Sequence, residues 1–163
     1  ELTHLIGNAT LSTSPSLILR QRRNLSDGWS RGVETSVIHK RRQWTADASY
    51  LFADARLSTG PRLAQVPKQQ GSGGITYSAD GTLVSLGIRA YGLQFDDDIN
   101  QFLLPGYAAL QLTAQQRLRH GLFAQAAVEN LLDRQYLVAL TPTPNTGAPR
   151  LWRIGLRWSG SLH

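Results

Sequence analysis

The chain has 163 residues, of which 41% are hydrophobic and 17% charged, and its formal net charge is +6. This length fits one domain, and no apolar stretch approaches the roughly 18 to 20 residues of a membrane-spanning helix. The absence of cysteine excludes disulfides, thiolate metal sites and cysteine nucleophiles. The positive charge alone permits nucleic acid, anionic lipid or an anionic small ligand as a partner.

Short segments in which apolar and polar residues alternate follow one another along the chain, as in β-strands. The first, at the amino end, alternates poorly, whereas the segment that begins at Tyr107 alternates almost perfectly. The predicted strands, about eight in all, are Leu2 to Leu11, Trp29 to His39, Trp44 to Phe52, Gly73 to Ala79, Val84 to Ala90, Tyr107 to Gln116, Leu122 to Leu131 and Leu151 to Trp158.

Short and long connections alternate strictly between these strands. Two of the three short connections contain Asp-Gly or His-Gly, which are typical of tight turns, whereas the long ones are rich in Pro, Asp, Asn, Thr and Gly. A transmembrane β-barrel has this arrangement, with tight turns at the periplasmic rim and long loops outside. The tight turns are Arg41 to Gln43, Ala79 to Gly81 and Arg119 to Gly121, and the long loops are Ser12 to Gly28, Asp54 to Pro67, Phe95 to Gly106 and Leu132 to Ala148.

The two faces of the predicted strands differ in charge. From Trp44 onward, the apolar face carries no Lys, Arg, Asp or Glu except at strand ends, and a charge at the middle of a bilayer would cost about 2 to 4 kcal/mol. The opposite face carries charged and amide side chains. Burying such groups without partners is costly, so this face indicates a water-filled interior. Its charged and amide residues include Asp47, Arg89, Gln111, Gln125, Glu129 and Arg153.

Aromatic residues favour the same interpretation, since amphipathic rings prefer the two interfaces of a membrane. We predict two girdles on this basis. One comprises Trp44, Tyr77 and Trp158 near the short turns, and the other comprises Trp29, Phe52, Tyr91, Tyr107 and Trp152 near the long loops.

The carboxyl end carries a specific pattern. Val128 to Tyr136 reads VENLLDRQY, a loop closes on Gly147-Ala148-Pro149-Arg150, and Leu151 to Trp158 alternates apolar residues with Arg and Gly. This end resembles that of TonB-dependent outer-membrane receptors. Further elements match the family in order, among them Thr3-His4-Leu5-Ile6, Arg31-Gly32-Val33-Glu34 and Leu104-Pro105-Gly106-Tyr107.

The resemblance implies an all-β fold, an antiparallel up-and-down transmembrane β-barrel. Residues 1–163 are expected to form a single segment of about eight strands, either part of a barrel of ~22 strands or closed on itself. The implied function is TonB-dependent uptake of a metal chelate, such as a ferric siderophore or cobalamin, across the outer membrane of a Gram-negative cell. The expected partners are outer-membrane lipid, the remaining barrel and plug, TonB through an N-terminal part that these residues do not include, and the chelate.

Two other protein classes stay open. A self-contained eight-stranded barrel could serve as a membrane anchor or adhesion protein, because eight strands can close around their own side chains. The weak alternation of Leu2 to Leu11 argues against it, since that segment would have to pair with Leu151 to Trp158. A soluble lipid-carrier barrel would need a polar outer face, which the uncharged stripes do not provide.

Candidate site residues follow from the faces and from the motif. Arg89, Arg150 and Arg153 are the predicted ligand contacts, because cations on the inner face suit an anionic chelate. No catalytic residue, cofactor or metal ligand is expected, since His4, His39, His120 and His163 lack ligand spacing and no nucleophile or phosphate-loop motif occurs. The motif residues, predicted to be structural, are Val128, Glu129, Asn130, Leu131, Asp133, Tyr136 and Trp158.

Three charged clusters have alternative interpretations. Arg20 to Arg23 and His39 to Arg42 are basic enough for nucleic acid, but they lack an aromatic stacking platform and are expected to face solvent and lipid headgroups, so no nucleic acid is expected as a partner. Asp96-Asp97-Asp98 could bind a hard cation through carboxylates. A solvated loop is the favoured interpretation, because no glycine-spaced calcium loop surrounds the triplet.

Overall fold

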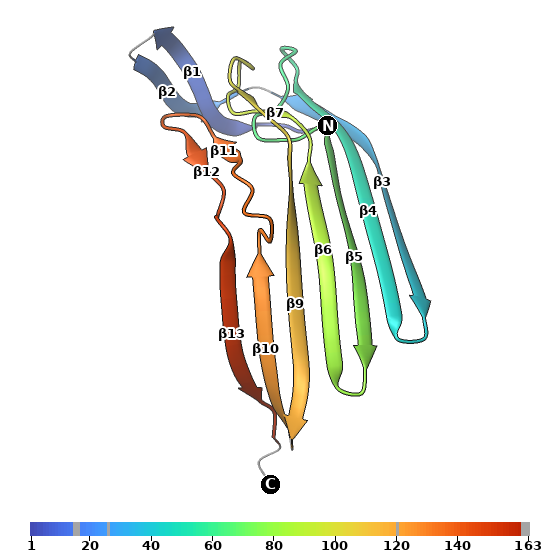
Figure 1. Ribbon diagram of the computed structural model, residues 1–163. Coiled ribbons are helices and arrows are strands. Elements are labelled where there is room, and N and C mark those ends of the chain that lie inside the picture. The colour runs from blue at the N-terminus through green and yellow to red at the C-terminus, as the bar shows by residue number, and fades with distance from the viewer. Residues whose placement is uncertain (15–16, 26, 120, 161–163) are drawn as a thin grey trace.

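The computed structural model describes residues 1–14, 17–25, 27–119 and 121–160, and every regular element in these ranges is a β-strand. Seven strands form one antiparallel sheet in the spatial order β13-β10-β9-β6-β5-β4-β3 (Figure 1). The antiparallel up-and-down prediction is confirmed. The strands are β3 (Gly28–Arg41), β4 (Trp44–Leu57), β5 (Gln69–Ala79), β6 (Thr82–Tyr91), β9 (Tyr107–Arg119), β10 (Leu122–Glu129) and β13 (Leu151–Trp158).

This sheet is open. β3 and β13 are its two edges and do not pair with each other, so the prediction of a barrel closed by these strands alone is wrong. The described residues contain no helix that is long and apolar enough to cross a membrane. The seven strands form an open wall, which ends at β3 on one side and at β13 on the other.

The first predicted strand is not part of this wall. Instead, β1 (Ile6–Ser14) pairs with β2 (Leu17–Asn24), and the two form a separate hairpin beyond the sheet (Figure 1). Leu2 alone bridges to the wall, through backbone hydrogen bonds of 2.8 Å in both directions with Gly28. The prediction of Leu2 to Leu11 as a wall strand is wrong, because β1 pairs with the arginine-rich β2 and not with a strand of the wall.

Two more short hairpins lie within the predicted long loops. β7 (Gln94–Phe95) pairs with β8 (Leu103–Leu104), and β11 (Leu137–Ala139) pairs with β12 (Asn145–Thr146). These hairpins and β1–β2 gather at one end of the sheet, which we call the loop end (Figure 1). The opposite end, which carries the tight turns, is the turn end.

The tight turns have the backbone that hairpins require. In the β5–β6 turn, Asp80 and Gly81 have φ values of +51° and +80°. Positive φ at both central positions matches the twist of paired strands, and Arg42 in the β3–β4 turn has φ +54°. His120 of the third predicted turn lies outside the described residues, and the adjoining Gly121 has φ +79°.

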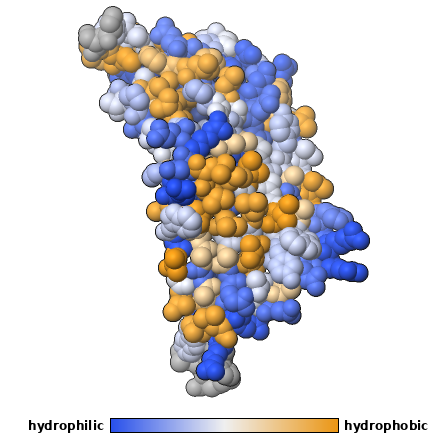
Figure 2. Space-filling model, in the orientation of Figure 1, coloured by the Kyte–Doolittle hydropathy of each residue, from blue (hydrophilic) through white to orange (hydrophobic). Residues whose placement is uncertain are grey.

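One face of the sheet is apolar and exposed. Trp44, Tyr77 and Val84 are register partners across β4, β5 and β6, so they share this face. Figure 2 shows hydrophobic side chains gathered over the middle of the molecule. An apolar surface of this kind suits lipid contact, and we call it the outer face. Its large exposed residues include Val33, Val37, Trp44, Tyr50, Ile75, Val84, Leu86, Ile88, Trp152, Ile154, Leu156 and Trp158.

Buried side chains concentrate at the loop end rather than in the sheet. Leu104 of β8 is fully buried, and Ala55 and Leu57 are buried where β4 reaches the loops. Ala9 of β1 and Val128 of β10 complete the buried apolar set among the described residues. The core of the chain thus lies among the long connections.

Candidate functional site

The face opposite the apolar one, the inner face, carries the polar side chains. The register aligns Ser49, Ser72 and Arg89 across β4, β5 and β6, and Ala109 of β9 continues the row. Ser49 and Ser72 join their hydroxyls at 2.8 Å. Arg89 therefore projects from the middle of the wall on its polar side.

A cluster of tyrosines lies next to this row, toward the loop end. Tyr91 and Tyr107 are register partners with ring centroids 5.1 Å apart. Tyr136, from the last loop, stacks on Tyr107 at 3.9 Å with an interplanar angle of 12°. The prediction that Tyr91 and Tyr107 belong to an outer girdle is wrong, because both are in phase with the inner-face residue Arg89.

Two hollows meet at Arg89 and Tyr91. The first has a volume of about 210 Å³, and Tyr107, Gln111 and Tyr136 contribute to its lining. The second has a volume of about 360 Å³ and extends over Glu34, Ser49, Gln70 and Ser72. Together they offer aromatic rings for stacking and a guanidinium for charge-assisted hydrogen bonds.

Arg89 and Arg153 differ in charge balance. In the ranges that the structure covers, no carboxylate forms an ion pair with Arg89. Arg153 instead pairs with Glu129 on the neighbouring strand β10. Of Arg89 and Arg153, Arg89 is thus the one that is available to an incoming ligand.

The three arginines predicted as ligand contacts do not converge. Arg153 lines a separate hollow of about 450 Å³ nearer the turn end. Arg150 is exposed, and its backbone N–H donates to Oδ1 of Asp133 at 2.9 Å. Only Arg89 lies with the tyrosines. The sequence could have revealed Tyr91, because it follows Arg89 by two residues and so shares its face.

The carboxyl-terminal motif builds the base of the last loop. Asn130 is only 6% exposed, and its Nδ2 donates to the carbonyls of Arg134 at 2.9 Å and Ala148 at 3.0 Å. Its Oδ1 accepts from the backbone N–H of Arg134 at 2.9 Å. All of these partners are backbone groups at the two ends of the last loop. These bonds fix the loop segment that presents Tyr136.

Comparison with known proteins identifies the fold family. The family model described as "TonB dependent receptor-like, beta-barrel" matches residues 3–131. The chain belongs to this family. The ferrioxamine B receptors of two Salmonella typhimurium strains, SL1344 and LT2, are 28% identical over an alignment of 133 residues that covers 72% of this chain and 19% of theirs. The chain therefore spans about a fifth of the length of these curated relatives.

Solved structures have the same fold at lower sequence identity. The copper transporter OprC superposes with a TM-score of 0.76 at 18% identity, over 94% of this chain and 26% of its own. The siderophore receptor PiuA from Acinetobacter baumannii gives 0.73 at 17%, over 94% and 24%. The ferripyoverdine receptor of Pseudomonas aeruginosa gives 0.70 at 19%, over 95% and 23%. Members of this TonB-dependent family are receptors and transporters, not enzymes.

Two of the three aspartates in the acidic triplet of this TonB-dependent receptor barrel are buried rather than solvated, and Asp98 is half-buried. Asp96 is 6% exposed and Asp97 is 2% exposed, both between β7 and β8. The solvated-loop interpretation is wrong, because Asp96 and Asp98 accept hydrogen bonds from segments remote in sequence and Asp97 from backbone N–H groups of its own loop. Among the described residues, no group of three His, Cys, Asp or Glu side chains could hold a metal ion. The triplet is therefore a structural feature of the loop end.

Proposed function

We propose that this chain forms part of the wall of an outer-membrane receptor in a Gram-negative cell, and that the receptor takes up a ferric siderophore with energy from TonB. Family membership and the exposed apolar outer face support the membrane location. The partners of the whole receptor are then the remaining barrel strands, a plug domain and TonB. Relatives named for ferrioxamine B and other siderophores favour a siderophore over cobalamin.

The observation that carries the proposal is the position of unpaired Arg89 beside the tyrosine cluster on the inner face. A metal chelate presents oxygen atoms and flat conjugated groups at its surface. The guanidinium suits the oxygens, since charge-assisted hydrogen bonds are the strong ones, and the phenol rings of Tyr91, Tyr107 and Tyr136 suit the flat groups. Iron is cargo here.

The charges of the two hollows indicate which chelates this wall suits. Glu34 lines the second hollow together with Arg89, so this hollow contains one negative and one positive side chain. The charge of Arg153 is balanced by its ion pair with Glu129. The local balance is close to neutral, so the wall offers little attraction to a strongly anionic complex. We infer a preference for chelates of low net charge.

The test is the substitution Arg89→Gln in the whole receptor, with ferrioxamine B, a ferric tris-catecholate and cyanocobalamin as probes. Loss of a charge-assisted hydrogen bond, worth about 1.5 to 3 kcal/mol, should weaken binding of the recognised probe about tenfold or more. The measurement is equilibrium binding together with uptake of labelled metal.

Arg119→Gln, near the turn end of β9, is the matched control and should leave binding unchanged. Equal affinity of the Arg89→Gln receptor and the unmodified one would remove Arg89 from the site. A whole receptor that binds no ferric siderophore, or that binds cyanocobalamin alone, would overturn the proposed function.

A further inference from the structure

The connections at the loop end meet at one acidic segment. Asp96 to Asp98 lies between the short strands β7 and β8. Its carboxylates accept hydrogen bonds from residues of β1, the β4–β5 loop and the β11–β12 loop. Segments separated by as many as 88 residues in the sequence are thus joined through one short stretch of chain.

Asp96 links two of these loops. Its Oδ1 accepts from Nε2 of Gln65, in the β4–β5 loop, at 3.1 Å. Its Oδ2 accepts from the backbone N–H of Leu140 at 3.1 Å and from both the N–H and the hydroxyl of Thr141, beyond β11. Both oxygens therefore accept hydrogen bonds, one from the β4–β5 loop and three from the segment that follows β11.

Asp98 binds a different segment, the β1–β2 hairpin. Its Oδ1 accepts from the hydroxyl of Thr10 at 2.6 Å, and both of its oxygens lie 3.1 Å from the Thr10 nitrogen. Asp97, between the two linking residues, accepts from the N–H groups of Gln101 at 3.0 Å and Phe102 at 2.8 Å. Asp97 thus fixes the conformation of its own loop, whereas Asp96 and Asp98 bind other segments of the chain.

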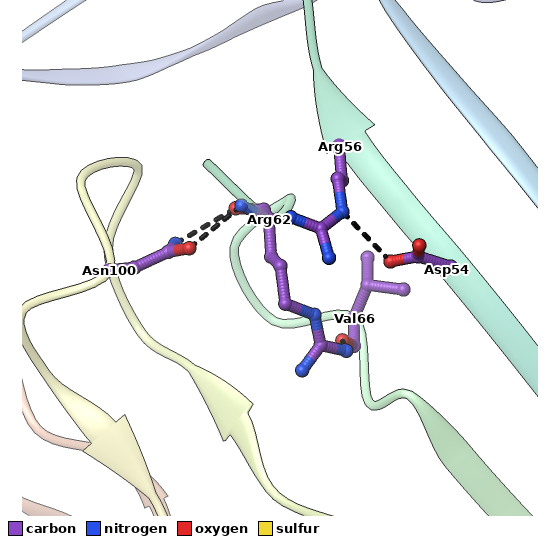
Figure 3. A network of polar contacts seen from close by, with 5 residues as sticks. All are labelled: Asp54, Arg56, Arg62, Val66 and Asn100. Atoms are coloured by element: carbon purple, nitrogen blue, oxygen red, sulfur yellow. Dashed lines mark hydrogen bonds and ion pairs between the residues drawn. The ribbon is translucent and has the colours of Figure 1, made fainter. Parts of the chain in front are cut away.

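Asn100 adds a link to the β4–β5 loop, which Figure 3 shows from close by. Its Oδ1 accepts from the backbone N–H of Arg62 at 2.7 Å, and its Nδ2 donates to the Arg62 carbonyl at 2.9 Å. Arg62 lies in the same loop as Val66, whose carbonyl accepts from Nη2 of Arg62. A side-chain amide that bonds both backbone groups of one residue fixes the separation and orientation of the two loops.

We propose that Asp96, Asp98 and Asn100 form a clamp that holds the external loops of this chain in one fixed arrangement, and that Asp96 within this clamp positions Tyr136 for ligand. The clamp stands on the contacts above, whereas its effect on ligand rests on the proposed function. Thr141 is tied to Asp96 on one side of β11, and Tyr136 directly precedes β11. Release of Thr141 therefore frees the segment that carries Tyr136, while the tight turns are untouched.

Spin-label distances in the whole receptor test the clamp without a ligand. The 163 residues contain no cysteine, so labels can be placed on introduced cysteines once any cysteine elsewhere in the receptor has been replaced. The exposed positions are Thr13 in β1, Thr59 in the β4–β5 loop and Thr143 in the β11–β12 loop. The pairs Thr59–Thr143 and Thr59–Thr13 should each give one narrow distance distribution in the unmodified receptor.

Asp96→Ala and Asp98→Ala serve as matched controls for each other. Asp96→Ala should replace the single Thr59–Thr143 distance by a broad distribution and leave the Thr59–Thr13 distance unchanged. Asp98→Ala should do the reverse. If each variant leaves both distributions narrow, or if both variants broaden both pairs alike, the clamp is contradicted.

Two further variants keep the test decisive if an aspartate variant fails to assemble, as heat-dependent gel mobility would reveal. Thr141→Val and Thr10→Val remove a hydroxyl donor from Asp96 and from Asp98 respectively, and each should broaden only its own pair. Weaker ferrioxamine B binding in Asp96→Ala but not in Asp98→Ala supports the positioning of Tyr136, and equal binding overturns it. A receptor that binds no probe contradicts the proposed function, while the distances still decide the clamp.

Discussion

Gly147 leaves the space that the ring of Tyr136 occupies. A Cβ atom at position 147 would lie 2.1 Å from Cε2 of that ring, closer than any real contact, and the N–H of Gly147 donates to the Tyr136 carbonyl at 2.8 Å. The stacking of Tyr136 on Tyr107 therefore depends on the absence of a side chain across the last loop.

Gly147→Ala should displace Tyr136 and loosen the last loop, because overpacking of this kind typically costs about 1 to 3 kcal/mol. We expect faster amide hydrogen exchange in β11 and β12 of the whole receptor. Gly155→Ala is the control, since a Cβ there would meet nothing within 4 Å. Equal exchange in the two variants would show that the glycine is not what positions the ring.

Asn130→Ala should expose the last loop to proteolysis. The substitution leaves the carbonyls of Arg134 and Ala148 without their donor, at a cost of about 1 to 3 kcal/mol, and it places alanine at a φ of +48°. Trypsin should then cut after Arg134 or Arg150 sooner than in the unmodified receptor. Asn145→Ala, at an exposed position, should not change the cleavage rate, and resistance in both variants would contradict the role of Asn130.

The loop end should loosen at acid pH. Burial alone would raise the pKa of Asp96, but hydrogen bonds from the Thr141 and Gln65 side chains and from the backbone of Leu140 and Thr141 lower the pKa below its ordinary value. A lowered pKa in the folded state means that the stabilisation is complete above the unfolded pKa, roughly pH 4, and is lost as the pH falls through the folded value.

Hydrogen exchange of residues 137–146 should therefore be the same at pH 7 and pH 5, once corrected for intrinsic rates, and should rise below about pH 4. Asp97, Asp98 and Arg20 line the same cavity of about 350 Å³, so their charges lie close to Asp96. The Asp96→Ala receptor separates their effects, because it should be loose at every pH. Loosening that begins well above pH 5 would assign the transition to another group.

A charge introduced on the outer face of β6 should lower the stability of the protein, whereas the same charge on the inner face should not. Leu86 is exposed on the apolar outer face, so Leu86→Arg places a guanidinium in lipid at a cost of about 2 to 4 kcal/mol. Ser85→Arg adds the same charge one residue earlier, on the inner face. Urea unfolding in lipid bilayers should show a loss of stability for Leu86→Arg alone, and equal losses would contradict the assignment of faces.

Alternation was sufficient to predict the wall strands and their faces. The final strand, Leu151 to Trp158, has the predicted bounds, because lipid contact enforces a strict two-residue period and turns mark its ends. The same period places Tyr91 on the inner face, and the girdle prediction failed for this residue because closeness to a loop does not determine which way a side chain points.

The loop end could not be predicted in the same way. β2 was expected to be loop, because Arg20, Arg22 and Arg23 give it no apolar period. The burial of Asp96 depends on donors such as Thr141, which is 45 residues away in the sequence. A local pattern contains no information about such a partner, so a buried triplet and a solvated one look alike in sequence.

The unpaired edges of β3 and β13 affect how this molecule can be studied. Each edge offers a row of free backbone N–H and C=O groups beside exposed apolar side chains such as Val37 and Ile154. Such rows are templates for strand addition, so residues 1–163 produced alone should grow into ladders of copies rather than remain separate. Chemical denaturation and refolding of this piece would then report on those ladders, and measurements meant for the receptor require the complete chain.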